Sequence, residues 1–146
     1  MRIEKGHVAG NELNGETTAA DLGLGRLMSA DKDFIGRVMA ARPGLTDPAR
    51  PALVGLRPLD RSARLRAGGH LLPVGARRAA ANDQGYVTSA AFSPALGHWI
   101  ALALLKGGRG RIGEHFNVHD PVRGADVEVV VTEPVAFDPE GSRCRA

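Results

Sequence analysis

The stretch GEHFNVHDPVRGADVEVVVT, residues 113–132, decides the fold. Apolar and polar residues alternate in 114–119 and largely again in 126–132, as they do in strands that bury one face. Between them, the segment 120–124 has the composition of a turn, with a proline to set the bend and a glycine to close it. The stretch therefore predicts an antiparallel hairpin.

Four earlier segments have strand length and apolar composition, and turn residues separate them: 52–56, 69–74, 85–92 and 98–105. Pro73 places the second of these at an edge or at a strand end. The fourth could also be a buried helix, but the glycines that bracket it favour a strand. Six short strands at even spacing predict a mainly β fold, a small six-stranded antiparallel, Greek-key-like barrel. We expect its interior to hold Val54, Leu72, Val87, Ile100, Leu102, Val118 and Val129.

The first 45 residues do not share this pattern, and we expect them to form a short α/extended segment before the barrel. Residues 24–29 are typical of a short strand or an extended link. A better helix is predicted to begin at Asp31 or Asp33, because apolar residues then recur at helical spacing. The sequence RPG at 42–44 should end it.

Composition places the chain among soluble globular proteins. It has 146 residues, 43% hydrophobic and 24% charged, which is enough for a buried core and too apolar for a disordered tail. No apolar run is long enough to cross a membrane, and the N-terminus lacks the apolar stretch of a signal peptide. The single cysteine, Cys144, excludes an intrachain disulfide and favours a reducing compartment. We therefore expect a cytoplasmic protein without membrane contact.

Charge is unevenly distributed, and this could indicate either steering surfaces or blocks that face each other. Residues 34–112 contain 12 Arg or Lys against 3 Asp or Glu, whereas residues 114–140 contain 7 acids and one arginine. Sequence-tolerant binding of single-stranded nucleic acid usually needs aromatic residues for base stacking, and they are scarce among these arginines. We expect no nucleic-acid partner.

The residue pattern alone gives little sign of catalysis or of metal binding. His115 and His119 have a zinc-like spacing for a helix, but in a strand they lie about 13 Å apart along the chain. No Gly-x-Ser-x-Gly nucleophile motif occurs, and the glycine-arginine runs lack the strand-to-helix context of a phosphate loop. We expect no catalytic residue and no metal site.

Several motifs, in order along the chain, carry a family resemblance. The opening RIEKGH (2–7), ELNGETT (12–18) and DLGLG (21–25) resemble the folate-dependent aminomethyltransferases of glycine cleavage. More particular motifs resemble the C-terminal end of the alpha subunit of heterotetrameric sarcosine oxidase: DFIGR (33–37), GYVTSA (85–90), LGHWI (96–100), DPVRG (120–124) and DPEG (138–141). The resemblance spans essentially the whole chain.

This resemblance implies a folate setting. Residues 1–45 would be the C-terminal remnant of an aminomethyltransferase folate-binding domain, and residues 46–146 the C-terminal barrel domain. The cofactor would be tetrahydrofolate, with flavin and NAD bound elsewhere in the complete enzyme and the other sarcosine oxidase subunits as partners. Arg2, Glu4 and Phe137 match family positions near the folate cavity. An ordinary ion pair for Arg2 and Glu4, and a plain core role for Phe137, are the alternatives.

The sequence leaves two expectations about function open. If the resemblance holds, this chain is the C-terminal part of a sarcosine oxidase alpha subunit, and by itself it should neither oxidise sarcosine nor transfer a one-carbon unit to folate. Its arginine-rich stretch, residues 57–78, would then dock against neighbouring subunits. Alternatively, the chain is a stand-alone, non-catalytic barrel that binds a ligand or a protein.

Overall fold

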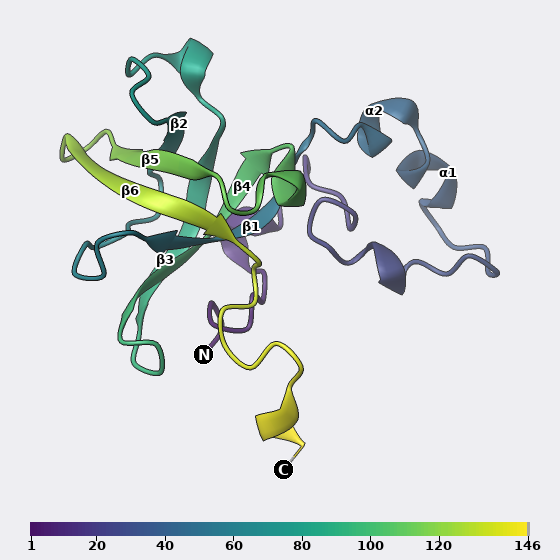
Figure 1. Ribbon diagram of the computed structural model, residues 1–146. Coiled ribbons are helices and arrows are strands. Elements are labelled where there is room, and N and C mark those ends of the chain that lie inside the picture. The colour runs from purple at the N-terminus through teal and green to yellow at the C-terminus, as the bar shows by residue number, and fades with distance from the viewer. Residues whose placement is uncertain (146) are drawn as a thin grey trace.

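In the computed structural model, which describes residues 1–145, six strands form one closed antiparallel barrel (Figure 1). The strands are β1 (Pro51–Pro58), β2 (His70–Pro73), β3 (Gly85–Ser93), β4 (His98–Lys106), β5 (His115–Asp120) and β6 (Ala125–Thr132). Around the barrel they follow the order β1-β4-β3-β2-β5-β6, and pairing of β6 with β1 closes it. The predicted mainly β class and six-stranded barrel are confirmed, and the fourth segment is a strand rather than a helix.

The hairpin that decided the fold forms as predicted. β5 and β6 pair in continuous register from His115 opposite Val130 to Asp120 opposite Ala125. The Gly124 N–H donates to the Asp120 carbonyl at 2.8 Å, and the Asp120 carboxylate accepts from the backbone N–H groups of Val122 and Arg123. Asp120, the last residue of β5, thus stabilises the turn that follows it.

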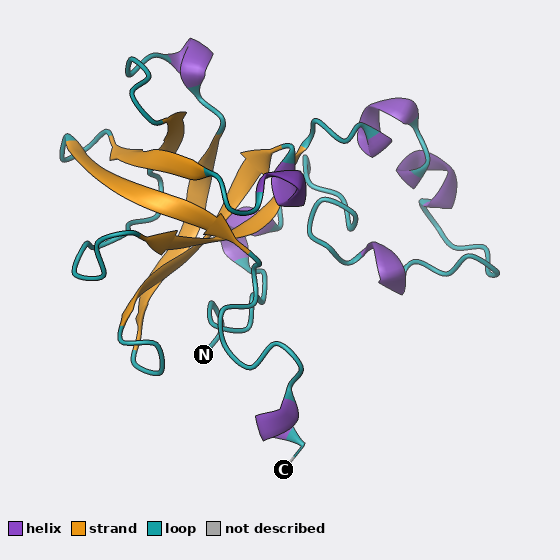
Figure 2. Ribbon diagram, viewed as in Figure 1, coloured by secondary structure: helices purple, strands orange, loops and turns teal. Residues whose placement is uncertain are grey.

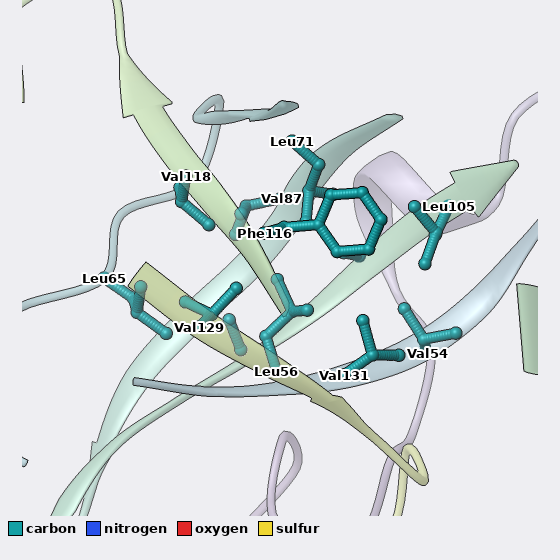
Figure 3. Close-up of a cluster of buried hydrophobic side chains, with 12 residues drawn as sticks. Val54, Leu56, Leu65, Leu71, Val87, Leu105, Phe116, Val118, Val129 and Val131 are labelled. Atoms are coloured by element: carbon teal, nitrogen blue, oxygen red, sulfur yellow. The ribbon is translucent and has the colours of Figure 1, made fainter. Parts of the chain in front are cut away.

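Large aliphatic side chains and Phe116 fill the barrel interior (Figure 3). Of the predicted interior residues, Val54, Val87, Val118 and Val129 belong to this cluster. Leu72, Ile100 and Leu102 are buried, but they lie outside it, so their placement in the interior was wrong. In β4 the interior positions are Ala101, Ala103 and Leu105.

The error in β4 has a physical cause. Because the first 45 residues cover part of the outer face of the barrel, β4 is buried on both sides and its sequence does not alternate. Leu102 and Leu104 pack outside the barrel, in a second cluster with Leu22 and Leu53. Without alternation, the sequence does not reveal which of two neighbouring residues points inward.

Short helices and turns make up the rest of the described chain (Figure 2). The α-helices are α1 (Arg37–Ala40) and α2 (Pro43–Thr46), and the 3-10 helices are η1 (Gly10–Glu12), η2 (Gly25–Leu27), η3 (Ala80–Asn82), η4 (Gly108–Arg111) and η5 (Ser142–Cys144). The stretch that carries η2, α1 and α2 stands away from the barrel (Figure 1). Residues 24–29, predicted as a short strand or an extended link, form no strand, since η2 occupies Gly25–Leu27.

The helix predicted from Asp31 or Asp33 to residue 42 is shorter than expected. α1 begins after Gly36, whose φ of +96° breaks the helical path, and Pro43 begins α2 instead of only ending α1. Ile35 and Val38, the residues that gave the helical spacing, are exposed. A helix without packing for its apolar face gains little beyond its propensity, which accounts for the single turn.

Candidate functional site

Residues 1–12 lie against β3 and hold it through charged side chains. The Arg2 guanidinium donates to Ser89 Oγ at 2.8 Å, and Glu4 Oε1 accepts from Ser93 Oγ at 2.5 Å. Glu4 is buried, and the hydrogen bond from Ser93 contributes most to a pKa of Glu4 below its ordinary value. Glu4 is therefore held as a carboxylate against the barrel.

Glu12, in η1, is the centre of a buried polar network. Its side chain is fully buried, and Oε1 accepts from both Thr88 Oγ1 and Ser89 Oγ at 2.6 Å. Oε2 accepts from the Ala9 N–H at 2.9 Å and lies 3.7 Å from the Arg2 guanidinium. Burial raises the pKa of Glu12, but the hydrogen bonds from Ser89, Thr88 and backbone N–H groups together outweigh it, so the net pKa is lowered. The network fixes the opening segment on β3.

The chain after β6 returns to the same place. The Glu4 carbonyl accepts from the N–H groups of Ala136 and Phe137 at 2.9 and 3.0 Å. Gly6, with a φ of +65°, permits this approach, because a Cβ there would lie 2.9 Å from the Pro134 carbonyl oxygen. The opening segment and the tail therefore form one layer over the barrel.

Two cavities lie beneath this layer. The larger, of about 270 Å³, lies among the opening segment, β1, β4 and the tail. It is lined by Ile3, Gly55, Leu56, Arg57, Leu96, His98, Ile100, Ala101, Thr132, Glu133, Pro134, Val135 and Ala136. The smaller, of about 220 Å³, is bordered by residues 1–4 together with Ala91, Phe92 and Ile100. Their linings combine apolar side chains with a few charged groups, as ligand sites usually do.

The structure brings the three predicted site residues together. Arg2 and Glu4 border the smaller cavity, and Phe137 is joined to Glu4 through its backbone. The Phe137 ring lies beneath the Arg143 guanidinium, with Arg143 Cζ 4.9 Å from the ring centroid. Arg2 and Glu4 do not pair with each other. The Arg2 guanidinium contacts Ser89, the His7 carbonyl and Glu12, and the Glu4 carboxylate contacts Ser93 and the N-terminal ammonium.

Lys5 and Asp138 join the two ends of this layer, and we expect their pair to make its stability sensitive to acid. Lys5 Nζ donates to the Asp138 carboxylate at 2.7 Å, which lowers the pKa of Asp138 to about 2. An unfolded aspartate titrates near pH 3.9. The pair therefore stabilises the fold above about pH 4, and this stabilisation is lost as the pH falls towards 2.

The test replaces Asp138 with asparagine. Asparagine tolerates the left-handed backbone, here a φ of +50°, so Asp138→Asn removes the charge without straining the chain. Urea denaturation between pH 7 and pH 2 should show the variant less stable than the parent above about pH 4, with the two converging at pH 2. A difference that stays constant across this range would contradict the assignment.

The barrel and its tail match a known protein family. Residues 52–138 match the model of the glycine cleavage T-protein C-terminal barrel domain, which is more than half of the chain. The chain belongs to this family. The T-protein barrel match covers β1 from Ala52 and the other five strands whole, and it ends at Asp138, so it includes the tail that returns to Glu4.

Curated relatives extend the similarity beyond the barrel. The chain is 49% identical over 144 residues to sarcosine oxidase subunit alpha of Rhizobium meliloti, covering 98% of this chain and 15% of that protein. It is 40% identical to the same subunit of Corynebacterium sp. strain P-1, again over 98% and 15%. An aminomethyltransferase of Saccharopolyspora erythraea is 37% identical over 90% of this chain and 34% of its own length. The chain thus spans about 15% of the length of the sarcosine oxidase subunits it matches.

A solved structure supports the fold independently. The crystal structure of glycine cleavage system aminomethyltransferase T from Bartonella henselae matches with a TM-score of 0.62 and 21% identity. The match covers 94% of this chain and 37% of that one, so it includes most of the segment that precedes the barrel. The arrangement of segment and barrel therefore recurs in that protein.

Sequence reasoning missed Glu12, the most buried acid of the layer. Glu12 lies in the ELNGETT motif, and a glutamate within a family motif is a signal that points to a structural or functional role. Within residues 1–145, no group of three or more His, Cys, Asp or Glu side chains is arranged to hold a metal ion. Across the same residues, no helix is long and apolar enough to cross a membrane.

Proposed function

We propose that this chain acts as the C-terminal part of a sarcosine oxidase alpha subunit. There it contributes to the tetrahydrofolate-binding aminomethyltransferase region that turns the oxidised methyl group of sarcosine into 5,10-methylenetetrahydrofolate. The observation that carries the proposal is the 49% identity to a sarcosine oxidase subunit alpha over 98% of the chain. In this proposal residues 1–45 complete a folate-binding domain, residues 46–146 form the barrel domain, and the whole works in the cytoplasm.

The cavities suit a partial rather than a complete folate site. Complete sites for ligands of this size enclose roughly 300–1,000 Å³. The larger of the two cavities beneath the opening segment and the tail has about 270 Å³, so it can enclose only part of a folate. The apolar lining of the larger cavity suits the aromatic parts of that cofactor, and the Arg2 guanidinium, which borders the smaller cavity, suits an anionic or carbonyl oxygen.

Each proposed residue has a positioning role. Arg2, half exposed, would meet the folate while Ser89 holds its guanidinium in place. Glu4, fixed by Ser93, would hold the opening segment and the tail at their present separation. Phe137 follows Ala136, which lines the larger cavity, and its ring, which lines neither cavity in the isolated chain, would wall the folate site in the complete enzyme. Tetrahydrofolate supplies the one-carbon acceptor when bound, and flavin and NAD would be bound by other parts of the enzyme.

A chimera tests the proposal directly. In the sarcosine oxidase of Rhizobium meliloti, the 144-residue stretch of subunit alpha that matches this chain is replaced by this chain. The chimera should oxidise sarcosine and form methylenetetrahydrofolate. Arg2→Ala and Phe137→Ala in the chimera should raise the Kd for tetrahydrofolate about tenfold each, as expected for the loss of about 1.4 kcal/mol of binding.

The controls separate folding from function. Val122→Ala, at an exposed position of the β5–β6 turn, should leave the Kd for tetrahydrofolate unchanged. The purified chain alone should produce neither peroxide from sarcosine nor methylenetetrahydrofolate. A chimera that assembles and oxidises sarcosine but forms no methylenetetrahydrofolate, or activity of the isolated chain, would overturn the proposal.

A further inference from the structure

A cavity of about 260 Å³ on the outer face of the barrel belongs to no part of the folate layer. It is lined by His70, Leu72, Arg78, Ala79, Ala80, Asp83 and His119. These residues come from β2, from the end of β5, and from the connection between β2 and β3 that carries η3. His70 of β2 and His119 of β5 therefore line the same cavity.

The register of the barrel makes these histidines direct neighbours. His70 on β2 is the antiparallel partner of His119 on β5. Directly opposed residues carry their side chains on the same face, with Cβ atoms roughly 4.5–5.5 Å apart. Leu71 and Val118, the next residues on each strand, point into the barrel, so the imidazoles point outward. In a tetrahedral metal site two ligand nitrogens lie roughly 3.3 Å apart, which side chains at this separation can reach.

Both imidazoles are oriented by a carboxylate. His70 Nδ1 lies 2.8 Å from Asp83 Oδ2, and His119 Nδ1 lies 2.7 Å from Asp126 Oδ1. A carboxylate accepts the Nδ1 proton, which leaves the lone pair of each neutral ring on Nε2. This pairing of Nδ1–H with a carboxylate is the usual support of a histidine that binds a metal through Nε2.

The charges around the cavity favour a cation over an anion. The Arg78 guanidinium is paired with the Asp126 carboxylate, so its charge is already balanced. The Asp83 carboxylate adds a negative charge to the lining, and the Lys106 ammonium nearby is bonded to the Asp83 carbonyl. In its neutral form, an imidazole that donates its Nδ1–H to a carboxylate presents a lone pair and not a hydrogen-bond donor at Nε2.

We propose that His70 and His119 form a binding site for a first-row transition-metal ion of the zinc or copper class. The two Nε2 atoms are the protein ligands, water completes the coordination, and Asp83 and Asp126 orient the rings. Imidazole nitrogen suits Zn²⁺ and Cu²⁺. Sequence reasoning expected no metal, because it compared His119 with His115 along one strand and not with its neighbour across the barrel. A bound ion would join β2 to β5.

Calorimetric titration of the untagged chain with ZnCl₂ and with CuCl₂ tests the site. Cys144 is changed to serine throughout, because a thiol would bind the same ions. We expect one ion per chain, with copper bound more tightly than zinc. His70→Ala combined with His119→Ala should abolish this binding, and Asp83→Asn should weaken it about 10- to 100-fold.

The matched control is His115→Ala. His115 is also an exposed histidine of β5 with a carboxylate neighbour, Glu128 Oε1 at 3.5 Å, but it does not line the cavity. This variant should bind both ions as the parent does, and excess zinc should raise the Tm of the parent and of His115→Ala but not of the double variant. Equal binding by the parent and the double variant, or no binding by a folded parent, would overturn the proposal.

Discussion

Replacing Glu12 with alanine is expected to lower the free energy of unfolding by about 3 kcal/mol. The carboxylate is fully buried and accepts from Thr88, Ser89 and the Ala9 N–H. Alanine would leave the Ser89 hydroxyl and the Ala9 N–H without their acceptor, whereas the Thr88 hydroxyl could still donate to the Leu102 carbonyl at 3.0 Å. Each buried unsatisfied group costs about 1–3 kcal/mol when no water replaces the partner. Urea denaturation monitored by circular dichroism at pH 7 gives the free energy of unfolding directly.

Two further variants identify the cause of that loss. Glu12→Gln keeps the size of the side chain and one acceptor oxygen, so it should lose less stability than Glu12→Ala. Glu16→Ala removes an exposed carboxylate four residues away and should change the free energy of unfolding by about 0.5 kcal/mol or less. Equal stability of Glu12→Ala and Glu16→Ala would show that the network does not hold the opening segment on β3.

The strands could be predicted because the sequence features that indicate them lie close together in the chain. In β5, and largely in β6, apolar and polar residues alternate, and the turn residues lie in one short stretch of sequence. Strand spacing then implied closure into a barrel. The sequence could not show which β4 residues point into the barrel. The segment that covers the outer face of β4, around Leu22, lies some eighty residues earlier in the chain.

The folate layer depends on contacts between distant residues. Glu4 and Ser93 are separated by 89 positions, and Lys5 and Asp138 by 133. No pattern in a single sequence links such pairs, and the resemblance alone brought Arg2, Glu4 and Phe137 into one prediction. The pairing of His70 with His119 is different, since it follows from the strand order, and a correct order of strands would have revealed it.

Replacing Phe116 with alanine is expected to cost about 3–5 kcal/mol of the free energy of unfolding, the largest single effect we predict for the barrel. Phe116 is 1% exposed, and its ring packs at the centre of the interior cluster (Figure 3), with the Arg111 guanidinium 4.6 Å from its centroid. Alanine would remove that packing and leave a cavity that the closed barrel can fill only by distorting paired strands. Phe92→Ala is the matched control, because Phe92 is 51% exposed and should cost about 1 kcal/mol or less. If both variants unfold at the same urea concentration, Phe116 does not organise the core, and the barrel must draw its stability from elsewhere.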